Sequence, residues 1–170
     1  MLMLFISTLT TFAQVPLYSS NPTASAVIFL DFDGHTVTGT GWNYNGPIVC
    51  SASGLDNAKI TTVFNSVAED YRPFNVNITT DSTKFLAAPL NKRMRVIITV
   101  SSSWYGSAGG VAFIGSFIWG DDTPCFVFSA LLNYSAKKVS EASSHEAGHT
   151  LGLYHQSTYD ANCGLLSDYN

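Results

Sequence analysis

Apolar and polar residues follow two different spacings along the chain, and these predict where helices and strands form. Between residues 56 and 72 the apolar side chains recur every three or four positions, with Asp56 as a cap before them and Pro73 as a stop after them. This pattern predicts an amphipathic helix. The spacing becomes helical again from about residue 136 to residue 151.

Short runs of apolar and β-branched residues around these helices predict strands. Residues 35–43 alternate like a strand or hairpin, residues 81–89 favour a short helix, and residues 45–54 are typical of a loop rich in Gly, Pro and Ser. The order of strands and helices predicts an α+β or mixed α/β fold in which one sheet carries helices. The expected strands cover residues 27–30, 75–79, 95–100, 109–115 and 125–129.

Composition restricts the class of protein. The 170 residues suffice for one domain, and 46% of them are hydrophobic while only 12% are charged, which excludes a disordered chain. The chain has eight basic and twelve acidic side chains, so it lacks the excess of positive charge that is typical of nucleic-acid-binding proteins. No segment after the N-terminus approaches the length that a membrane-spanning helix needs.

The first fourteen residues resemble a secretory signal peptide. They are apolar and uncharged, and the small residues around Ala13 are typical of a cleavage site, although the usual basic start is missing. A buried first strand is the alternative interpretation. We therefore expect a secreted or extracytoplasmic protein in which residues 1–14 are the signal and residues 15–170 form the folded domain.

Three cysteines, Cys50, Cys125 and Cys163, leave at least one thiol unpaired within the chain. Export would permit one disulfide, and Cys50 with Cys125 is the pair that we expect, without a geometric reason for it. No two of these cysteines have the CxxC spacing of a zinc site.

The sequence HEAGHTLGLYH, which begins at His145, carries the strongest chemical signal in the chain. On a helix, His145 and His149 lie on one face, one turn apart, so both imidazoles reach one Zn²⁺ ion. Gly152 can end the helix in a left-handed conformation, and the reversed chain then brings His155 to the same ion. Glu146, beside the first ligand, is placed to take a proton from zinc-bound water and pass it to a leaving amine.

The alternative is a structural helix with ordinary core histidines, but chance rarely produces every position of this pattern. The segment resembles the extended zinc signature HExxHxxGxxH of the metzincin metallopeptidases, the clan of astacins, serralysins, matrixins, reprolysins and pappalysins. The resemblance implies one catalytic Zn²⁺ bound by His145, His149 and His155, with Glu146 as general base and acid. It also implies a twisted, mostly parallel sheet with an antiparallel edge strand, a backing helix and a zinc-binding helix.

Metzincins bind an extended peptide along the antiparallel edge strand of their sheet. By resemblance, residues 109–115 are the candidate for that strand, and Gly110, Val111 and Ala112 are the candidates for contact with substrate. A plain edge strand without this role is an equal alternative.

The chain departs from the metzincin pattern downstream of His155. The clan has a methionine-containing turn beneath the zinc, whereas the three methionines of this chain all precede the motif. We therefore expect the C-terminal subdomain to be incomplete. Asp121 and Asp122 are equally well explained as a solvated loop or as part of a calcium site, and calcium has no further support.

A second motif points to different chemistry. VIFLDFDG, at residues 27–34, resembles the first motif of the haloacid-dehalogenase phosphatases, in which Asp31 would be the nucleophile and Asp33 the acid or base of a magnesium-dependent reaction. Asp121 and Asp122 could imitate the magnesium-binding carboxylates of such an enzyme, but the lysine that it has between its second motif and these carboxylates is absent here. A solvated Asp-x-Asp-Gly turn after a strand explains the same residues more simply.

These patterns together predict a secreted zinc endopeptidase that hydrolyses peptide or protein substrates with a metal-activated water. Two alternatives stay open: a zinc-binding module that is inactive, and the magnesium-dependent phosphatase. The three functions differ in the metal that they need and in whether Glu146 or Asp31 is essential.

Overall fold

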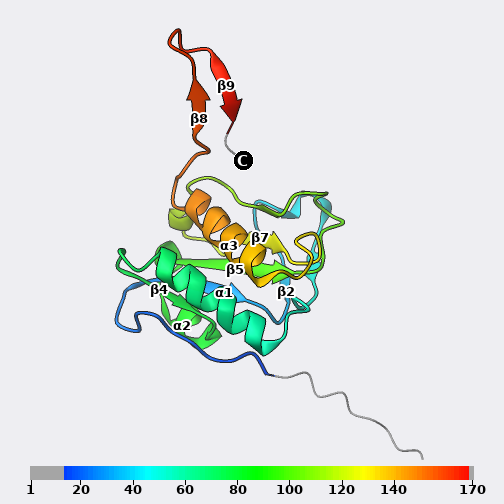
Figure 1. Ribbon diagram of the computed structural model, residues 1–170. Coiled ribbons are helices and arrows are strands. Elements are labelled where there is room, and N and C mark those ends of the chain that lie inside the picture. Colours follow the sequence, from blue (N-terminus) through cyan, green and yellow to red (C-terminus); the bar gives the residue numbers. More distant parts are fainter. Residues whose placement is uncertain (1–13, 169–170) are drawn as a thin grey trace, which may run out of the picture.

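A five-stranded sheet forms the centre of the molecule (Figure 1), for which a computed structural model describes residues 14–168. The order across the sheet is β4 (Val76–Thr79), β1 (Ala26–Asp31), β5 (Arg93–Thr99), β7 (Cys125–Phe128) and β6 (Gly110–Val111). The first four of these are parallel, and β6 pairs antiparallel with β7 at the edge. This arrangement confirms the expected mixed α/β fold, with a mostly parallel sheet and an antiparallel edge strand.

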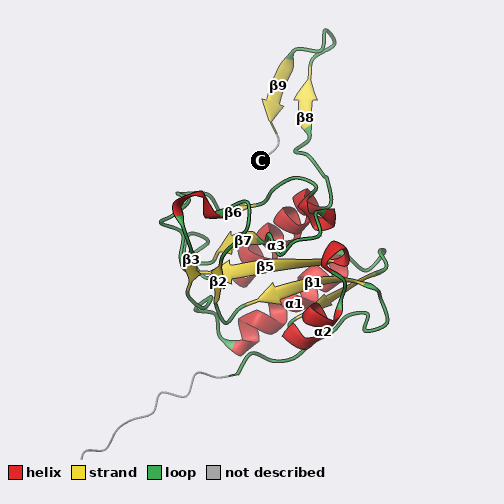
Figure 2. Cartoon of the chain, turned by 180° about the vertical axis from the view of Figure 1, so that it is seen from behind, coloured by secondary structure: helices red, strands yellow, loops and turns green. Residues whose placement is uncertain are grey.

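Helices and a small hairpin cover the two faces of this sheet. On one face, α1 (Asn57–Asp70) and α3 (Ala136–Thr150) pack side by side (Figure 1). The other face is covered by α2 (Ser82–Ala87) and by the antiparallel pair β2 (His35–Val37) and β3 (Ile48–Cys50) (Figure 2). Short 3₁₀ turns occur at η1 (Asn43–Asn45), η2 (Leu90–Lys92) and η3 (Ser116–Ile118).

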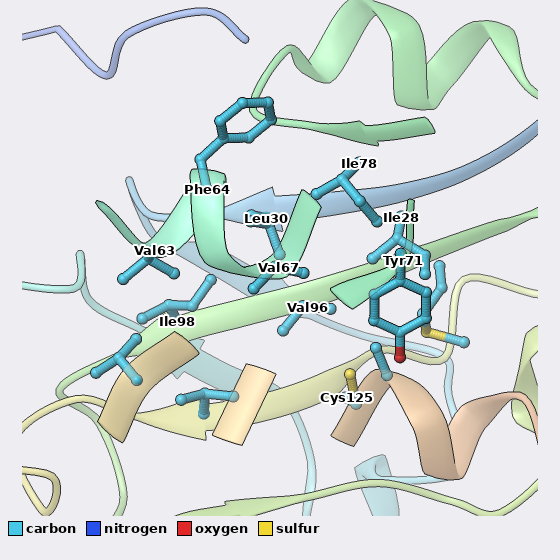
Figure 3. Close-up of a cluster of buried hydrophobic side chains, with 14 of the residues drawn as sticks. Ile28, Leu30, Val63, Phe64, Val67, Tyr71, Ile78, Val96, Ile98 and Cys125 are labelled. Carbon is cyan, nitrogen blue, oxygen red and sulfur yellow. The ribbon is translucent and has the colours of Figure 1, made fainter. Parts of the chain in front are cut away.

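Side chains of the central strands alternate between the two faces, as the period of two along a strand requires. Ile28 and Leu30 of β1 pack in one cluster with Val63 and Val67 of α1 (Figure 3). Phe29 points to the other face, where it packs against α2. The four aliphatic side chains are fully buried, and burial of each contributes about 1.5–3 kcal/mol to stability.

The first long helix, α1, matches the one that the hydrophobic spacing predicts, including its cap. The Asp56 carboxylate accepts a hydrogen bond from the backbone N–H of Lys59 at 2.8 Å. At the other end, the Tyr71 hydroxyl donates to the carbonyl of Ser144 at 2.9 Å, and the Ser144 hydroxyl donates to Asp70 at 2.6 Å. These two bonds attach the end of α1 to the middle of α3.

Three parts of the chain differ from the expectation. The strand β3 lies inside residues 45–54, which composition assigned to a loop. The composition could not predict it, because this strand forms by pairing with β2, which is a tertiary contact. The edge strand β6 is shorter than the expected strand at 109–115 and ends before Ala112. After α3 the chain forms a further hairpin that no pattern predicted and that extends away from the sheet (Figure 1); its strands are β8 (Ser157–Tyr159) and β9 (Leu165–Asp168).

The expected disulfide between Cys50 and Cys125 is wrong, because all three cysteines are free. Cys125 packs in the cluster beneath α1 and α3, whereas Cys50 belongs to the cluster on the opposite face of the sheet. Burial raises the pKa of both thiols, that of Cys50 to about 11. They therefore stay protonated near neutral pH.

The expected signal peptide falls outside the described residues except for Gln14. The carbonyl of Gln14 accepts a hydrogen bond from the side chain of Asn57 at 3.3 Å. A little further on, Tyr18 to Ser20 run beside β4 and bond to it. Within residues 14–168, no helix combines the length and the apolar character that a membrane crossing requires.

Asp31, the last residue of β1, is a buried carboxylate with 1% of its surface exposed. Like Phe29, it points to the face of the sheet opposite α3, where it forms an ion pair with Arg95 of β5. Burial, and then the neighbouring Asp33, raise the pKa of Asp31 to about 7, although Arg95 lowers it. Desolvation therefore outweighs the ion pair.

The raised pKa of Asp31 makes the stability of the fold depend on pH. The unfolded carboxyl titrates near 3.8, so the native state binds the extra proton between about pH 4 and pH 7, and the free energy of unfolding falls as pH rises through that window. Asp31→Asn removes this titration. Relative to the native sequence, its free energy of unfolding should rise by about 2 kcal/mol from about pH 5 to about pH 7.5.

Denaturant unfolding at the two pH values measures this difference. Glu69→Gln, a change at an exposed carboxylate of α1, is the control and should show no comparable rise. A relative stability of Asp31→Asn that stays constant or falls with pH would contradict the protonated, buried carboxyl.

Candidate metal centre and cleft

Three histidine side chains converge at the end of α3. His145 and His149 project from the same face of this helix, and His155 lies on the segment that follows it. The Nε2 atoms of the three rings are 2.9 to 3.0 Å apart. The structure thus brings together, at the ends of their side chains, the three residues that the sequence pattern proposed as ligands.

The way in which α3 ends explains how the third histidine reaches the helix face. Gly152 adopts a left-handed conformation with a φ of 96°. Its N–H donates to the carbonyl of His149 at 2.9 Å, and the N–H of Leu153 donates to the carbonyl of Gly148 at 3.1 Å. This pair of bonds is the Schellman motif, which satisfies the last carbonyls of a helix and reverses the chain. Gly152 therefore occupies the turn that the sequence pattern assigned to it.

The same turn orients the ring of His149. Its Nδ1 atom lies 2.7 Å from the carbonyl oxygen of Leu153, which can only accept a hydrogen bond. Nδ1 therefore carries the proton, and the lone pair of Nε2 is directed to the other two rings. A metal-ligating histidine usually has such a partner on its second nitrogen, because the bond holds both the tautomer and the orientation of the ring.

The three Nε2 atoms form a donor set in which a metal ion fits. Nitrogen lone pairs only 2.9 to 3.0 Å apart repel one another unless a proton or a cation lies among them. A tetrahedral ion with bonds of about 2.0–2.1 Å separates its nitrogen ligands by about 3.3 Å, so a small outward movement of the rings suffices. Partial burial, and then His149 and His155, lower the pKa of His145, which favours the neutral, ligating form of its ring.

Glu146 lies on the buried side of α3, next to the first histidine. Only 7% of its surface is exposed, and this burial raises the pKa of its carboxyl to about 7. Its side chain lies against Gly110 of β6, where an added Cβ would be 2.7 Å from both Cγ and Oε1 of Glu146 and 2.8 Å from the carbonyl oxygen of Phe126. The lack of a side chain at Gly110 is therefore what lets β6 approach the carboxylate.

A cleft of about 620 Å³ runs between α3 and the segment that contains β6. The three histidines and Glu146 contribute to its lining, which places the metal-binding atoms and the carboxylate in one space. The residues that the resemblance assigned to substrate contact, Gly110, Val111 and Ala112, line the same cleft. Because β6 is the edge strand of the sheet, this arrangement leaves a strand edge beside the candidate metal centre.

The residues of the phosphatase alternative lie elsewhere. Asp31 is buried, paired with Arg95 and directed to the face opposite α3. Asp121 and Asp122 are bonded to their own loop and to an arginine of β5, respectively. Within residues 14–168, only the histidine triple has three metal-ligating side chains whose donor atoms are close enough to share an ion.

The histidine motif does not predict two contacts that build the site. One is the bond from His149 to the carbonyl of Leu153, which has no sequence signal because every residue carries a carbonyl. The other is the contact between Gly110 and Glu146. Its only signal is the glycine itself, since glycine within a strand marks a point where another group approaches closely.

Comparison with known proteins adds no family to this description. No model of a protein family matches the chain, and no curated protein sequence matches it. The assignment of the site therefore depends on the histidine motif and on its geometry.

The candidate metal centre makes a direct prediction about zinc binding. We expect the chain to bind one Zn²⁺ ion, and His155→Ala to weaken this binding by more than about a hundredfold, because a catalytic zinc site needs three protein ligands. The matched control is His35→Ala, which removes the one histidine outside the cluster, in β2. Competition with a chromophoric chelator measures the affinities. A His155→Ala chain that holds zinc as tightly as the His35→Ala chain would contradict the assignment.

Proposed function

We propose that this chain is a zinc-dependent endopeptidase of the metzincin type. The observation that carries the proposal is the convergence of three imidazole Nε2 atoms beside a buried glutamate, in a cleft bordered by an edge strand. A mixed α/β fold in which a helix holds the first two histidines is compatible with that clan. Export from the cytoplasm, which the signal-like residues 1–14 favour, belongs to the same proposal.

The chemistry is divided between the metal and one carboxylate. Zn²⁺, when held by the three histidines, supplies a Lewis acid that polarises the scissile carbonyl and makes a water molecule more acidic. The Glu146 carboxylate accepts a proton from the water as the water oxygen bonds to the carbonyl carbon. It then donates that proton to the amine nitrogen as the carbon–nitrogen bond breaks. In the metal-free chain, burial raises the pKa of this carboxyl to about 7, which makes it a better proton acceptor than an exposed glutamate.

The edge strand supports an extended peptide as the substrate. A peptide that pairs with a strand edge gains backbone hydrogen bonds that do not depend on its sequence. Gly110 of β6 lies in contact with Glu146, so a peptide beside β6 would also lie beside the carboxylate. The same backbone that orders the substrate thereby places a peptide bond next to the general base.

Substitution of Glu146 tests the proposed reaction. Glu146→Gln keeps the size of the side chain but cannot accept a proton, so we expect cleavage of casein or gelatin to fall by about a hundredfold or more while zinc stoichiometry is retained. Glu69→Gln, on the exposed surface of α1, is the control and should cleave like the native chain. A zinc-loaded native chain without cleavage would identify an inactive zinc-binding module instead, and an active Glu146→Gln chain would exclude the proposed base.

Substitution of Gly110 tests whether β6 positions that base. In Gly110→Ala the new methyl group would meet Glu146 and a backbone oxygen at under 3.0 Å, so either the carboxylate or the strand must move. We expect kcat to fall by about tenfold or more with zinc affinity unchanged, because the histidines are not displaced. In Gly109→Ala the methyl group would approach only the Leu132 side chain, at 3.1 Å, so its loss of kcat should be much smaller. Equal effects in the two variants would argue against the positioning role.

A further inference from the structure

One carboxylate in the cleft, that of Glu141, has no part in the proposed reaction. Among the residues that line the cleft, Glu141 and Glu146 are acidic, and none is a lysine or an arginine. Glu146 is buried against β6, whereas Glu141 is exposed. An accessible carboxylate therefore faces the space in which a substrate would lie.

Glu141 lies on the same face of α3 as the histidines. Lys137, Glu141, His145 and His149 follow one another every four residues and so form one stripe along the helix. Four helical residues advance about 6 Å along the axis, and an extended peptide advances about 3.3 Å per residue. A substrate side chain one or two residues from the scissile bond is thus within reach of Glu141.

The surroundings of Glu141 suit a long side chain with a cationic end. Ala108 and Ala142 line the same cleft and leave room for an aliphatic stem. Tyr105, also in the lining, has 43% of its surface exposed, and its ring stacks on Phe128 with the ring centroids 6.0 Å apart. Tyr105 and Glu141 line the same cleft, and a guanidinium group is the cation that can both stack on an aromatic ring and pair with a carboxylate.

We propose that the cleft selects peptides with a cationic side chain, arginine above all, within two residues of the scissile bond, and that Glu141 determines this preference. The inference rests on the proposed peptidase function and names the class of substrate for the same site. Lysine ranks below arginine because its ammonium group is more strongly hydrated and has no planar face to stack on Tyr105.

The present partner of Glu141 does not prevent this role. Lys137 forms an ion pair with Glu141 across one turn of α3, and the two side chains are 80% and 59% exposed. Exposed pairs at this spacing are weak, because water screens both charges and two long side chains lose freedom. Lys137 is not part of the cleft lining. A substrate cation inside the cleft can therefore replace Lys137 as the partner of Glu141 at little cost in free energy.

Two peptides that differ only in one charge test the preference. One contains arginine and the other citrulline, which keeps the shape of the side chain without its charge. With the zinc-loaded chain, kcat/KM for the arginine peptide should exceed that for the citrulline peptide by about fivefold, and Glu141→Gln should bring this ratio close to one. Glu69→Gln, which removes a carboxylate of α1 that is paired with Arg72 just beyond that helix, is the matched control and should keep the ratio. Lys137→Met should raise the arginine-to-citrulline ratio, because it removes the cation that competes for Glu141.

Binding of the same peptides separates this inference from the proposed function. The zinc-loaded Glu146→Gln chain keeps Glu141, and fluorescence anisotropy gives its Kd for each peptide, with Glu141→Gln added as a second change. Cleavage of both peptides at equal rates, or equal Kd values, would overturn the preference while leaving the peptidase proposal intact. If nothing is cleaved but the arginine peptide binds about fivefold more tightly and Glu141→Gln abolishes the difference, the preference is supported and the peptidase proposal fails.

Discussion

The left-handed turn at the end of α3 is the constraint on which the candidate site depends. The backbone bonds of Gly152 and Leu153 to the last carbonyls of the helix reverse the chain, and this reversal returns His155 to the face that holds the other two rings. The turn also supplies the carbonyl that holds the ring of His149. One backbone conformation thus sets the position of the third nitrogen donor and the tautomer of the second.

The turn can fix the position of His155 relative to the other two rings because α3 itself is packed firmly against the rest of the fold. Val139 and Ala147 of this helix are fully buried against the sheet and α1, and the bond from Tyr71 to Ser144 attaches it to α1 one residue before the first histidine. The edge strand approaches from the other side, where Gly110 contacts Glu146. Two of the candidate ligands, His145 and His149, and the Glu146 carboxylate are therefore carried by one helix that is packed on both sides, which limits how far their donor atoms can move apart.

The alternation of side chains along β1 separates the two candidate motifs in space. The histidine motif leaves its donor atoms together in a cleft, whereas Asp31 of the phosphatase-like motif points to the opposite face and is enclosed with Arg95. The same alternation separates Cys50 from Cys125, which the count of cysteines alone could not exclude as a pair. For Asp31 and for the two cysteines, the face of the strand determines which groups each side chain can reach.

Features with local causes follow from the sequence alone. The helix α1, its cap at Asp56, the shared face of His145 and His149, and the turn at Gly152 all depend on contacts within one or two helical turns, and all are found as expected. The edge strand also followed from the pattern, although not its length, and its antiparallel direction followed from the resemblance to metzincins. What the tertiary structure alone decided are the pairing of β2 with β3, the hairpin of β8 and β9, the contact of Gly110 with Glu146, and the position of Glu141 in the cleft. The physical reason is that burial, pairing and close approach depend on which distant residues meet, and a linear pattern carries little information about that choice.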